Sequence, residues 1–343
     1  MSANAASRPV HTVAVGASAG GIEALRGLVG ALPADFPAVV LVVLHVAPVA
    51  TSVLPQILTR AGPLRAVHAE HGLALRGGLI CVAPPDRHLL IEDGRLVLDK
   101  GPRVNGHRPA IDPLFSSAAH SYGDGVAGIV LSGVLDDGTA GLMAIKRHGG
   151  LTMAQDPAEA LYANMPRSAI DFVRPDVIGT VKELGRRLSE LAQPMPAGSR
   201  VTLTTVPTVA ESLLEVDRGA SDRPQPGEPT GLTCPECSGG IWESVEDGIL
   251  RLRCRVGHEF GAETLIAAQA DQVEIALWTA LRALEERVAI HRRMATRLRE
   301  RGSGVSAERF AWRADQGVEH AVVLRELLGA VHDEHVEDDE SVA

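Results

Sequence analysis

A serine in a glycine-rich turn is the residue of this sequence best suited to chemistry. The segment GASAG, centred on Ser18, follows an apolar run over residues 13–15 and precedes an amphipathic stretch over 22–32. This is the G-x-S-x-G pattern of a strand-to-helix turn, in which small neighbours leave the serine hydroxyl accessible. Free N–H groups at the start of the helix could stabilise an oxyanion. The turn indicates a nucleophilic serine, and a tight turn without chemistry is the alternative.

The same turn excludes two phosphate-binding motifs. A dinucleotide fingerprint, G-x-G-x-x-G, would need a glycine where Ser18 stands. A P-loop would need Gly-Lys followed by Ser or Thr, whereas Gly21 is followed by Ile22. We therefore expect no nucleotide at this turn and no cofactor for catalysis.

A nucleophilic serine needs a base, and the base needs an acid that orients it. In an open parallel sheet, functional side chains gather beyond the carboxyl ends of the strands. His45 closes the apolar run 38–44 and is the expected base, with a structural histidine at a strand end as the alternative. Asp136 and Asp137 follow the apolar run 126–132; we assign Asp137 as the acid, and one of the two could instead cap the next helix. Solvated histidines are expected at the loop or helix positions His68, His71, His88, His107, His120 and His148.

Strand and helix patterns alternate up to about residue 193 and would position these residues. Strands are predicted over 11–16, 38–44, 79–83, 126–132, 150–154 and 177–180. Helices are predicted over 20–31, 51–60, 111–122, 138–148, 166–172 and 181–193. Such alternation predicts an α/β fold, a mostly parallel, doubly wound sheet with helices on both faces. A hairpin is predicted over 88–98, around Asp93 and Gly94, and a polar loop follows.

Six separated blocks of sequence resemble one family. In order, they are GASAGGIEAL, VVLHVAP, ICVAPPDRHLLI, VNGHRPAIDPLFSSAA, GIVLSGVLDDGTAGL and TMAQDPAEALYANMPRSAI. Over about residues 8–192, the chain resembles the catalytic domain of CheB, the chemotaxis protein-glutamate methylesterase. The resemblance implies a triad of Ser18, His45 and Asp137, near the loop 105–109. The order Ser, His, Asp in the sequence differs from that of the α/β-hydrolases.

The resemblance also implies a reaction and its partners. The expected reaction is serine hydrolysis of glutamate methyl esters, with deamidation of glutamines through the same acyl-enzyme, on a methylated chemoreceptor-like protein. The oxyanion is expected to face backbone N–H groups near Ala19 and Val134, and Arg108 is a further candidate contact to substrate. A signalling adaptor that binds partners through its C-terminal part is the alternative function.

The sequence departs from the family pattern at three places. Ala19 stands where the family usually has threonine, and the loop before the acid reads GVLDDG in place of GMGNDG. The first predicted strand begins within about a dozen residues of residue 1, so we expect no receiver domain here. A regulatory partner could take its place, the enzyme could be constitutively open, or the C-terminal part could regulate it. Changes at Val134 and Leu135 remove a methionine and a glycine beside the expected site.

Three of the four cysteines form a metal-binding pattern. Cys234 and Cys237 give C-x2-C, and after sixteen residues Cys254 and His258 give C-x3-H. Two close ligand pairs on either side of a short hairpin suit tetrahedral Zn²⁺, and four protein ligands indicate a structural site. Reduced thiols beside a surface histidine are the alternative. Cys81 lies in a predicted strand and is expected in the core.

The C-terminal half is predicted to comprise three further segments after a domain over 8–193. These are a linker over 194–231 with a short helix near 208–217, a zinc-ribbon-like module over 232–261, and a C-terminal helical hairpin over 262–332. The hairpin breaks near Gly302, with its second helix over 306–330. It could bind a partner, associate with itself, or simply pack on itself.

Charge and hydropathy limit the function classes. The 343 residues carry a net charge of -10, which argues against nucleic-acid binding and against an anionic membrane surface. No apolar run reaches about 18 residues, so no membrane insertion is expected. The first residues lack a basic segment followed by an apolar core, so we expect no secretory signal and a cytoplasmic location.

Overall fold

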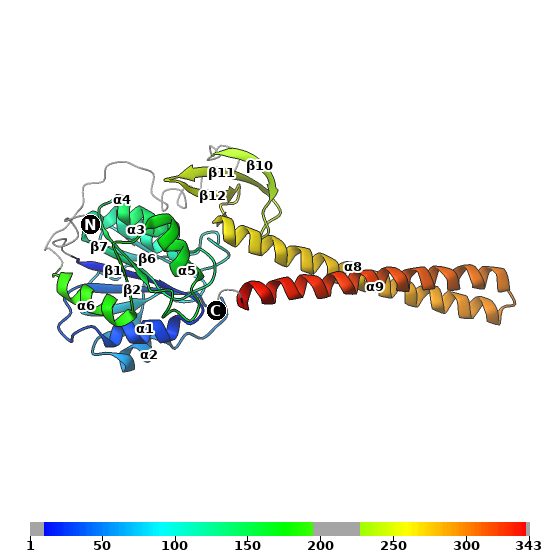
Figure 1. Cartoon of the computed structure of the whole chain (residues 1–343), viewed down its shortest axis with the longest axis horizontal. Coiled ribbons are helices and arrows are strands. Elements are labelled where there is room, and N and C mark those ends of the chain that lie inside the picture. Colours follow the sequence, from blue (N-terminus) through cyan, green and yellow to red (C-terminus); the bar gives the residue numbers. More distant parts are fainter. Residues whose placement is uncertain (1–9, 195–226, 341–343) are drawn as a thin grey trace. The chain divides into compact units, whose positions relative to one another are not determined.

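The computed structural model describes residues 10–194 and 227–340, without the side chains of 330–340 (Figure 1). The chain divides into two compact units, one on each side of the boundary between Leu265 and Ile266. The short helix predicted near 208–217 lies outside the described residues. The four segment boundaries given above therefore remain predictions.

A seven-stranded parallel sheet forms the centre of the first unit. Its order is β3-β4-β2-β1-β7-β8-β9, and every neighbouring pair is parallel. The strands are β1 (Thr12–Ala17), β2 (Val39–Leu44), β3 (Arg65–His68), β4 (Leu79–Val82), β7 (Val126–Val130), β8 (Leu151–Gln155) and β9 (Val177–Gly179). From β1 the chain proceeds to β2 on one side and later returns to β7 on the other. A topological switch point therefore lies at the carboxyl end of β1, where open α/β sheets bind ligands.

Helices cover both faces of this sheet (Figure 1). The first face carries α1 (Gly21–Gly30), α2 (Leu54–Ala61) and α6 (Val181–Leu191), and the second carries α3 (Ile111–Tyr122) and α4 (Thr139–Arg147). Side chains of β2 alternate between two cores, with Val40 and Val42 in the first and Leu41 and Val43 in the second. Because both faces are buried, the central strands are continuous apolar runs, and the predicted doubly wound α/β fold is confirmed.

The smaller elements of this region were only partly predicted. The hairpin of β5 (His88–Glu92) and β6 (Arg95–Asp99) forms as expected. Strand β3 was not predicted, because this short edge strand is only partly buried and lacks an apolar run. In place of the helix predicted over 166–172, the chain forms α5 (Asn164–Ser168) and then a π-helical turn over Ala169–Val173.

The Cys/His module belongs to the first unit and is an antiparallel sheet. Its strands, in sheet order, are β10 (Glu228–Thr233), β11 (Gly240–Glu246), β12 (Ile249–Cys254) and β13 (Glu259–Phe260). The hairpin of β11 and β12 lies between the two ligand pairs, where a short hairpin was expected. Strands β10 and β13 were not predicted, because one is largely exposed and the other is two residues long.

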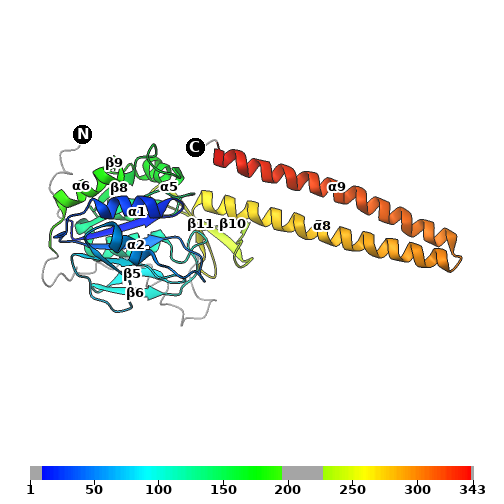
Figure 2. The ribbon, with the colours of Figure 1, turned by 90° about the horizontal axis from the view of Figure 1, so that it is seen from below.

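The second unit is a helical hairpin in which two long helices run side by side (Figures 1 and 2). Helix α8 spans Ala262–Glu300, with its first residues in the first unit, and α9 spans Gly304–Glu340. Leu281, Ala321 and Leu328 form their buried contact. No helix in the described part of the chain is long and apolar enough to cross a membrane.

Candidate active site and metal centre

The Ser18 turn is held tightly at the end of β1. The Ser18 N–H donates to the Ser132 carbonyl at 2.9 Å. Gly20 has a φ of +67°, and a Cβ there would lie 2.7 Å from Ser132 Oγ, so only glycine fits without strain. A Cβ at Gly133 would lie 2.1 Å from Met165 Sδ and 2.9 Å from Ser18 Cβ. These close approaches leave no room for a side chain at either glycine.

Ser132 is a scaffold residue that the sequence interpretation missed. Its hydroxyl donates to the Ala19 carbonyl at 2.8 Å and accepts the Tyr162 N–H at 3.0 Å. Its own N–H donates to Gln155 Oε1 at 2.9 Å. Ser132 thereby ties the Ser18 turn to the segment after β8. Its place just beyond β7, the strand next to β1, was the available signal.

Ser18, His45 and Asp137 lie together at the carboxyl ends of neighbouring strands. His45 Nδ1 is 3.1 Å from Ser18 Oγ, and His45 Nε2 is 2.7 Å from Asp137 Oδ2. Because an ionised carboxylate can only accept, the ring proton belongs on Nε2, which leaves the Nδ1 lone pair facing the hydroxyl. This geometry can take a proton from Ser18 as its oxygen attacks a carbonyl carbon.

Asp137 is an ionised carboxylate in a buried place, with 2% of its surface exposed. Besides the imidazole, it accepts from the Asn105 side-chain amide and from the backbone N–H groups of Ile111, Asp112 and Gly138. Burial alone would raise the pKa of Asp137. The hydrogen bond to His45, the charge of His45, and the hydrogen bonds from the Ile111 N–H and the Asn105 amide together lower it below its ordinary value. The carboxylate therefore stays charged and can orient the imidazole.

Neither Asp136 nor Asp137 caps α4 with its side chain, so this alternative was wrong. Asp137 instead accepts the first N–H groups of α3, and Asp112 Oδ1 accepts the Gly141 N–H in α4 at 2.6 Å. The two helices begin side by side. Asp137, which precedes α4, therefore accepts N–H groups of α3, and Asp112 in α3 accepts an N–H group of α4. The Asp136 carboxylate accepts from the Thr264 hydroxyl.

A cavity of about 340 Å³ opens beside the serine and the imidazole. Its lining is Ser18, His45, Val46, Ala47, Pro48, Arg103, Gly106, His107 and Arg108. Two of the expected oxyanion donors, Ala19 and Val134, are not among these residues. No acceptor among the described residues engages either backbone N–H.

Arg108 lines the cavity but its guanidinium is already engaged. Nε and Nη2 donate to Asp86, and Nη1 donates to the Gly101 carbonyl at 2.6 Å. The hydrogen bond from Arg108 also lowers the pKa of Asp86. Arg108 thus ties the cavity loop to the turn before β5.

Two histidines that were expected to be solvated are not, and this expectation was wrong. His107 stacks on His45 with ring centroids 3.7 Å apart and planes 12° from parallel. Burial and the nearby His45 lower the pKa of His107 to about 4, so a neutral ring covers one face of the imidazole. His88 is 1% exposed and its Nε2 donates to the Pro102 carbonyl at 2.9 Å. Both residues join the loop over 101–109 to the site.

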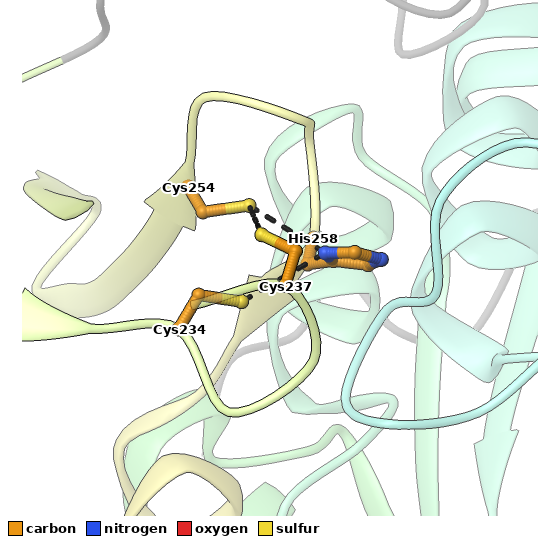
Figure 3. A group of neighbouring side chains, drawn as sticks. All are labelled: Cys234, Cys237, Cys254 and His258. Carbon is orange, nitrogen blue, oxygen red and sulfur yellow. Dashed lines mark hydrogen bonds between the residues drawn. The ribbon is translucent and has the colours of Figure 1, made fainter. Parts of the chain in front are cut away.

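Cys234, Cys237, Cys254 and His258 converge as predicted (Figure 3). Their four ligand atoms lie within 4.8 Å of one another. The Sγ atoms of Cys237 and Cys254 are 3.6 Å apart, and His258 Nδ1 lies 3.8 Å from Cys234 Sγ. These distances exceed a disulfide bond and are close to the edges, about 3.8 Å, of a tetrahedron with Zn–S bonds of about 2.3 Å. The cluster could hold a metal ion with four protein ligands.

The first half of the chain is similar to known proteins in sequence and in fold. Residues 13–188 match the family model described as CheB methylesterase. A protein-glutamate methylesterase/protein-glutamine glutaminase of Anaeromyxobacter dehalogenans is 40% identical over 184 residues, 54% of each chain. A Leptospira interrogans relative is 36% identical over 53% of this chain and 95% of its own length.

Two further matches extend the comparison. The protein-glutamate methylesterase FrzG of Myxococcus xanthus is 38% identical over 47% of this chain and 49% of its own. The crystal structure of the Thermotoga maritima CheB methylesterase catalytic domain superposes with a TM-score of 0.51 at 32% identity, over 53% of this chain and 98% of that one. The chain spans about half the length of the Anaeromyxobacter and Myxococcus relatives. It belongs to the CheB methylesterase family through residues 13–188.

Proposed function

We propose that this chain is a serine esterase that hydrolyses glutamate methyl esters on a protein substrate. The observation that carries the proposal is the hydrogen-bonded series of Ser18, His45 and Asp137 beside a cavity, within a CheB methylesterase domain. The names of the Anaeromyxobacter and Myxococcus relatives support the same activity.

The proposed reaction proceeds in two acyl-transfer steps. Ser18 Oγ attacks the γ-carbonyl carbon while His45 Nδ1 takes its proton. The C–O bond to the methoxy group then breaks, His45 returns the proton, and methanol leaves. Water repeats the sequence on the acyl-serine and releases the glutamate carboxylate with one proton. Asp137 holds the imidazole and stabilises its charged form throughout.

We assign the oxyanion of the tetrahedral intermediate to the Ala19 and Val134 N–H groups. Both lack another acceptor among the described residues, and Ala19 directly follows the nucleophile. Losing one such donor typically costs about 100- to 1,000-fold in rate. Arg108 shapes the cavity in this proposal and leaves the oxyanion to the backbone, because Asp86 and Gly101 already engage its guanidinium.

The same acyl-enzyme would form from a glutamine side chain, with ammonia as the leaving group. The Anaeromyxobacter relative is named as both a methylesterase and a glutaminase, which supports proposing ester hydrolysis and glutamine deamidation for this site. We further propose that the substrate is a methylated chemoreceptor-like protein in the cytoplasm, and that a separate regulatory partner controls access to it.

We also propose that Cys234, Cys237, Cys254 and His258 bind Zn²⁺. Three thiolates and an imidazole are typical ligands of structural zinc, and four ligands leave no position for a catalytic water. The ion would supply no chemistry to ester hydrolysis. It would hold the Cys234–Cys237 turn and the Cys254–His258 turn against each other, and so fix the ends of β12 and β13.

Incubation of methylated receptor with the wild-type chain and with Ser18→Ala tests the proposed hydrolysis. We expect methanol release to fall at least about 1,000-fold in the variant, because the nucleophile is gone. Ser189→Ala, in α6, is the control and should match the wild type. Equal methanol release by wild type and Ser18→Ala would contradict the proposed mechanism. A serine-directed fluorophosphonate probe that fails to label Ser18 would favour the adaptor alternative.

A further inference from the structure

The Cys/His module pairs with the loop that lines the cavity. The Asn105 N–H donates to the Glu259 carbonyl at 2.7 Å, and the Glu259 N–H donates to the Arg103 carbonyl at 3.3 Å. Val104 and Glu259 form a parallel bridge, so β13 extends the sheet of the module to residues 103–105. The loop that carries Asn105 and His107 is therefore held by a strand outside the family match, which ends at residue 188.

Asn105 joins the module to the acid of the proposed triad. Its side chain is buried, its Oδ1 accepts the Gly261 N–H at 2.7 Å, and its Nδ2 donates to Asp137 Oδ1 at 2.9 Å and to Asp112 Oδ2 at 3.2 Å. A backbone N–H can only donate, so Gly261 fixes which end of the amide is oxygen. The NH₂ group is thereby directed at both carboxylates. A freely rotating amide would satisfy them only part of the time.

Arg251 in β12 supplies the positive charge for this buried acidic group. Its Nη1 lies 3.1 Å from Asp112 Oδ2 and its Nη2 lies 2.8 Å from Glu259 Oε1, with 14% of its side chain exposed. Asp112 and Asp137 share the Asn105 amide, so their charges repel at short range. Removing the positive partner of a buried carboxylate leaves an uncompensated charge, which is strongly unfavourable.

We propose that Arg251 is a positioning residue of this esterase, acting on Asp137 through Asp112 and Asn105. It touches neither Ser18 nor His45, and this inference rests on the proposed function of those residues. Without Arg251, burial and the charge of Asp137 raise the pKa of Asp112 further, so this carboxyl either keeps its proton at neutral pH or moves. Either change displaces the Asn105 amide and loosens the hydrogen bond that holds Asp137 against the imidazole. The module is in this way a part of the active site.

Arg253 provides a matched control for Arg251. It lies on the same strand and pairs with the same Glu259, through Nε at 2.9 Å and Nη2 at 2.6 Å. Among the described residues it pairs with Glu259 and not with Asp112. Arg251→Met and Arg253→Met therefore remove equal charge and one ion pair with Glu259 each. Only Arg251→Met removes the contact to the catalytic region.

The test compares these variants in the full-length chain by kcat and KM for methylated receptor, by the labelling rate of Ser18 with a fluorophosphonate, and by thermal unfolding. For Arg251→Met we expect kcat to fall about 10- to 100-fold with KM within about twofold, because the acid is misplaced and the cavity is intact. Arg253→Met should stay within about threefold of wild type in kcat. Wild-type kcat in Arg251→Met, or an equal loss in Arg253→Met, would overturn the proposal.

Arg251→Lys keeps the test decisive if Arg251→Met does not fold. A lysine retains the charge but lacks the planar fork that spans two carboxylates, so we expect a smaller loss of kcat, about three- to tenfold. A folded Arg251→Lys variant with wild-type kcat would contradict the proposed role. If wild type released no methanol from receptor, the proposed substrate would fail, and the labelling rates of Ser18 would still compare the variants.

Discussion

The α/β region and the Cys/His module hold their polar groups in place by different means. The sheet and its helices enclose two extensive apolar cores, one on each face of the sheet. In the module, the buried apolar cluster comprises only Cys234, Ile241, Leu252, Cys254, Phe260 and Leu265. Two of these six are members of the Cys/His cluster, so the module has little core without it. Small domains of this kind usually need a metal or disulfides to fold.

The two regions also stabilise buried charges differently. In the α/β region, backbone N–H groups at a helix start stabilise Asp137. In the module, guanidinium groups do this work, because Arg251 and Arg253 both pair with Glu259. The α/β region stabilises the buried charge of Asp137 with backbone N–H groups, whose positions are already fixed by the helix that carries them. The module stabilises its buried charge with the long side chains of Arg251 and Arg253. The positions of these side chains depend on how the short strands β12 and β13 are held together.

Asp137→Asn, in the α/β region, should have the largest effect on activity. An amide at this position favours the wrong tautomer of His45, and we expect kcat for ester hydrolysis to fall about 10⁴-fold. Methanol release measures the loss, with Asp124→Asn, on the turn before β7, as the control. A loss below about tenfold would mean that Asp137 does not orient the base.

Removal of the metal should destabilise the Cys/His module. We expect about one equivalent of zinc in wild type after metal-replete purification and much less in Cys237→Ser, with a lower midpoint of thermal unfolding. Activity should fall as well, since β13 holds the loop of Asn105. Cys81→Ala changes a thiol in β4, outside the cluster, and should retain the metal. Zinc analysis that finds equal metal in Cys237→Ser and wild type would contradict the ligand assignment.

Asp112 lies where the α/β region and the Cys/His module are in contact, and its titration should make the stability of the folded chain depend on pH. Burial, opposed by Arg251 and reinforced by Asp137, raises the pKa of Asp112 to about 7 in the folded chain, against about 3.9 in the unfolded chain. The folded state therefore holds the extra proton between these values. This group makes the free energy of unfolding fall as pH rises from about 4 to 7, by at most about 1.4 kcal/mol per pH unit.

Asp112→Asn should remove this contribution to the pH slope. Urea unfolding of wild type and variant at several pH values between 4.5 and 7 measures it, and titration of other groups cancels in the difference. Parallel slopes in the two proteins would show that the pKa of Asp112 is not raised by folding.

The smallest expected effect concerns Leu135, in the loop where the sequence departs from the CheB pattern. Leu135 has a φ of +62°, a left-handed conformation that costs a side-chain-bearing residue about 1–2 kcal/mol. Leu135→Gly relieves this strain but adds freedom to the unfolded chain, so we expect a net gain of about 0.5 kcal/mol in the free energy of unfolding. Leu135→Ala retains the conformation and should show no gain. Urea unfolding of both variants and of wild type measures these free energies, and an equal gain in the two variants would contradict the role given to the left-handed conformation.

Much of the site could be predicted from the sequence because its parts are local. Ser18, His45 and Asp137 each follow an apolar strand, and the carboxyl ends of parallel strands meet at one edge of a sheet. The four cysteine and histidine ligands come in two pairs with short spacings, which local turns bring together. In both cases the geometry of one or two elements determines where the side chain lies.

The contacts between the α/β region and the Cys/His module could not be predicted from the sequence. The contact from Arg251 to Asp112 spans 139 residues of sequence, and that from Gly261 to Asn105 spans 156. No periodicity or spacing in the sequence encodes such pairs, because they depend on how separate layers pack. The stacking of His107 on His45 has the same origin, since a polar loop shows no pattern that fixes its path. Local patterns determined which residues could react, and packing between distant segments determined what surrounds them.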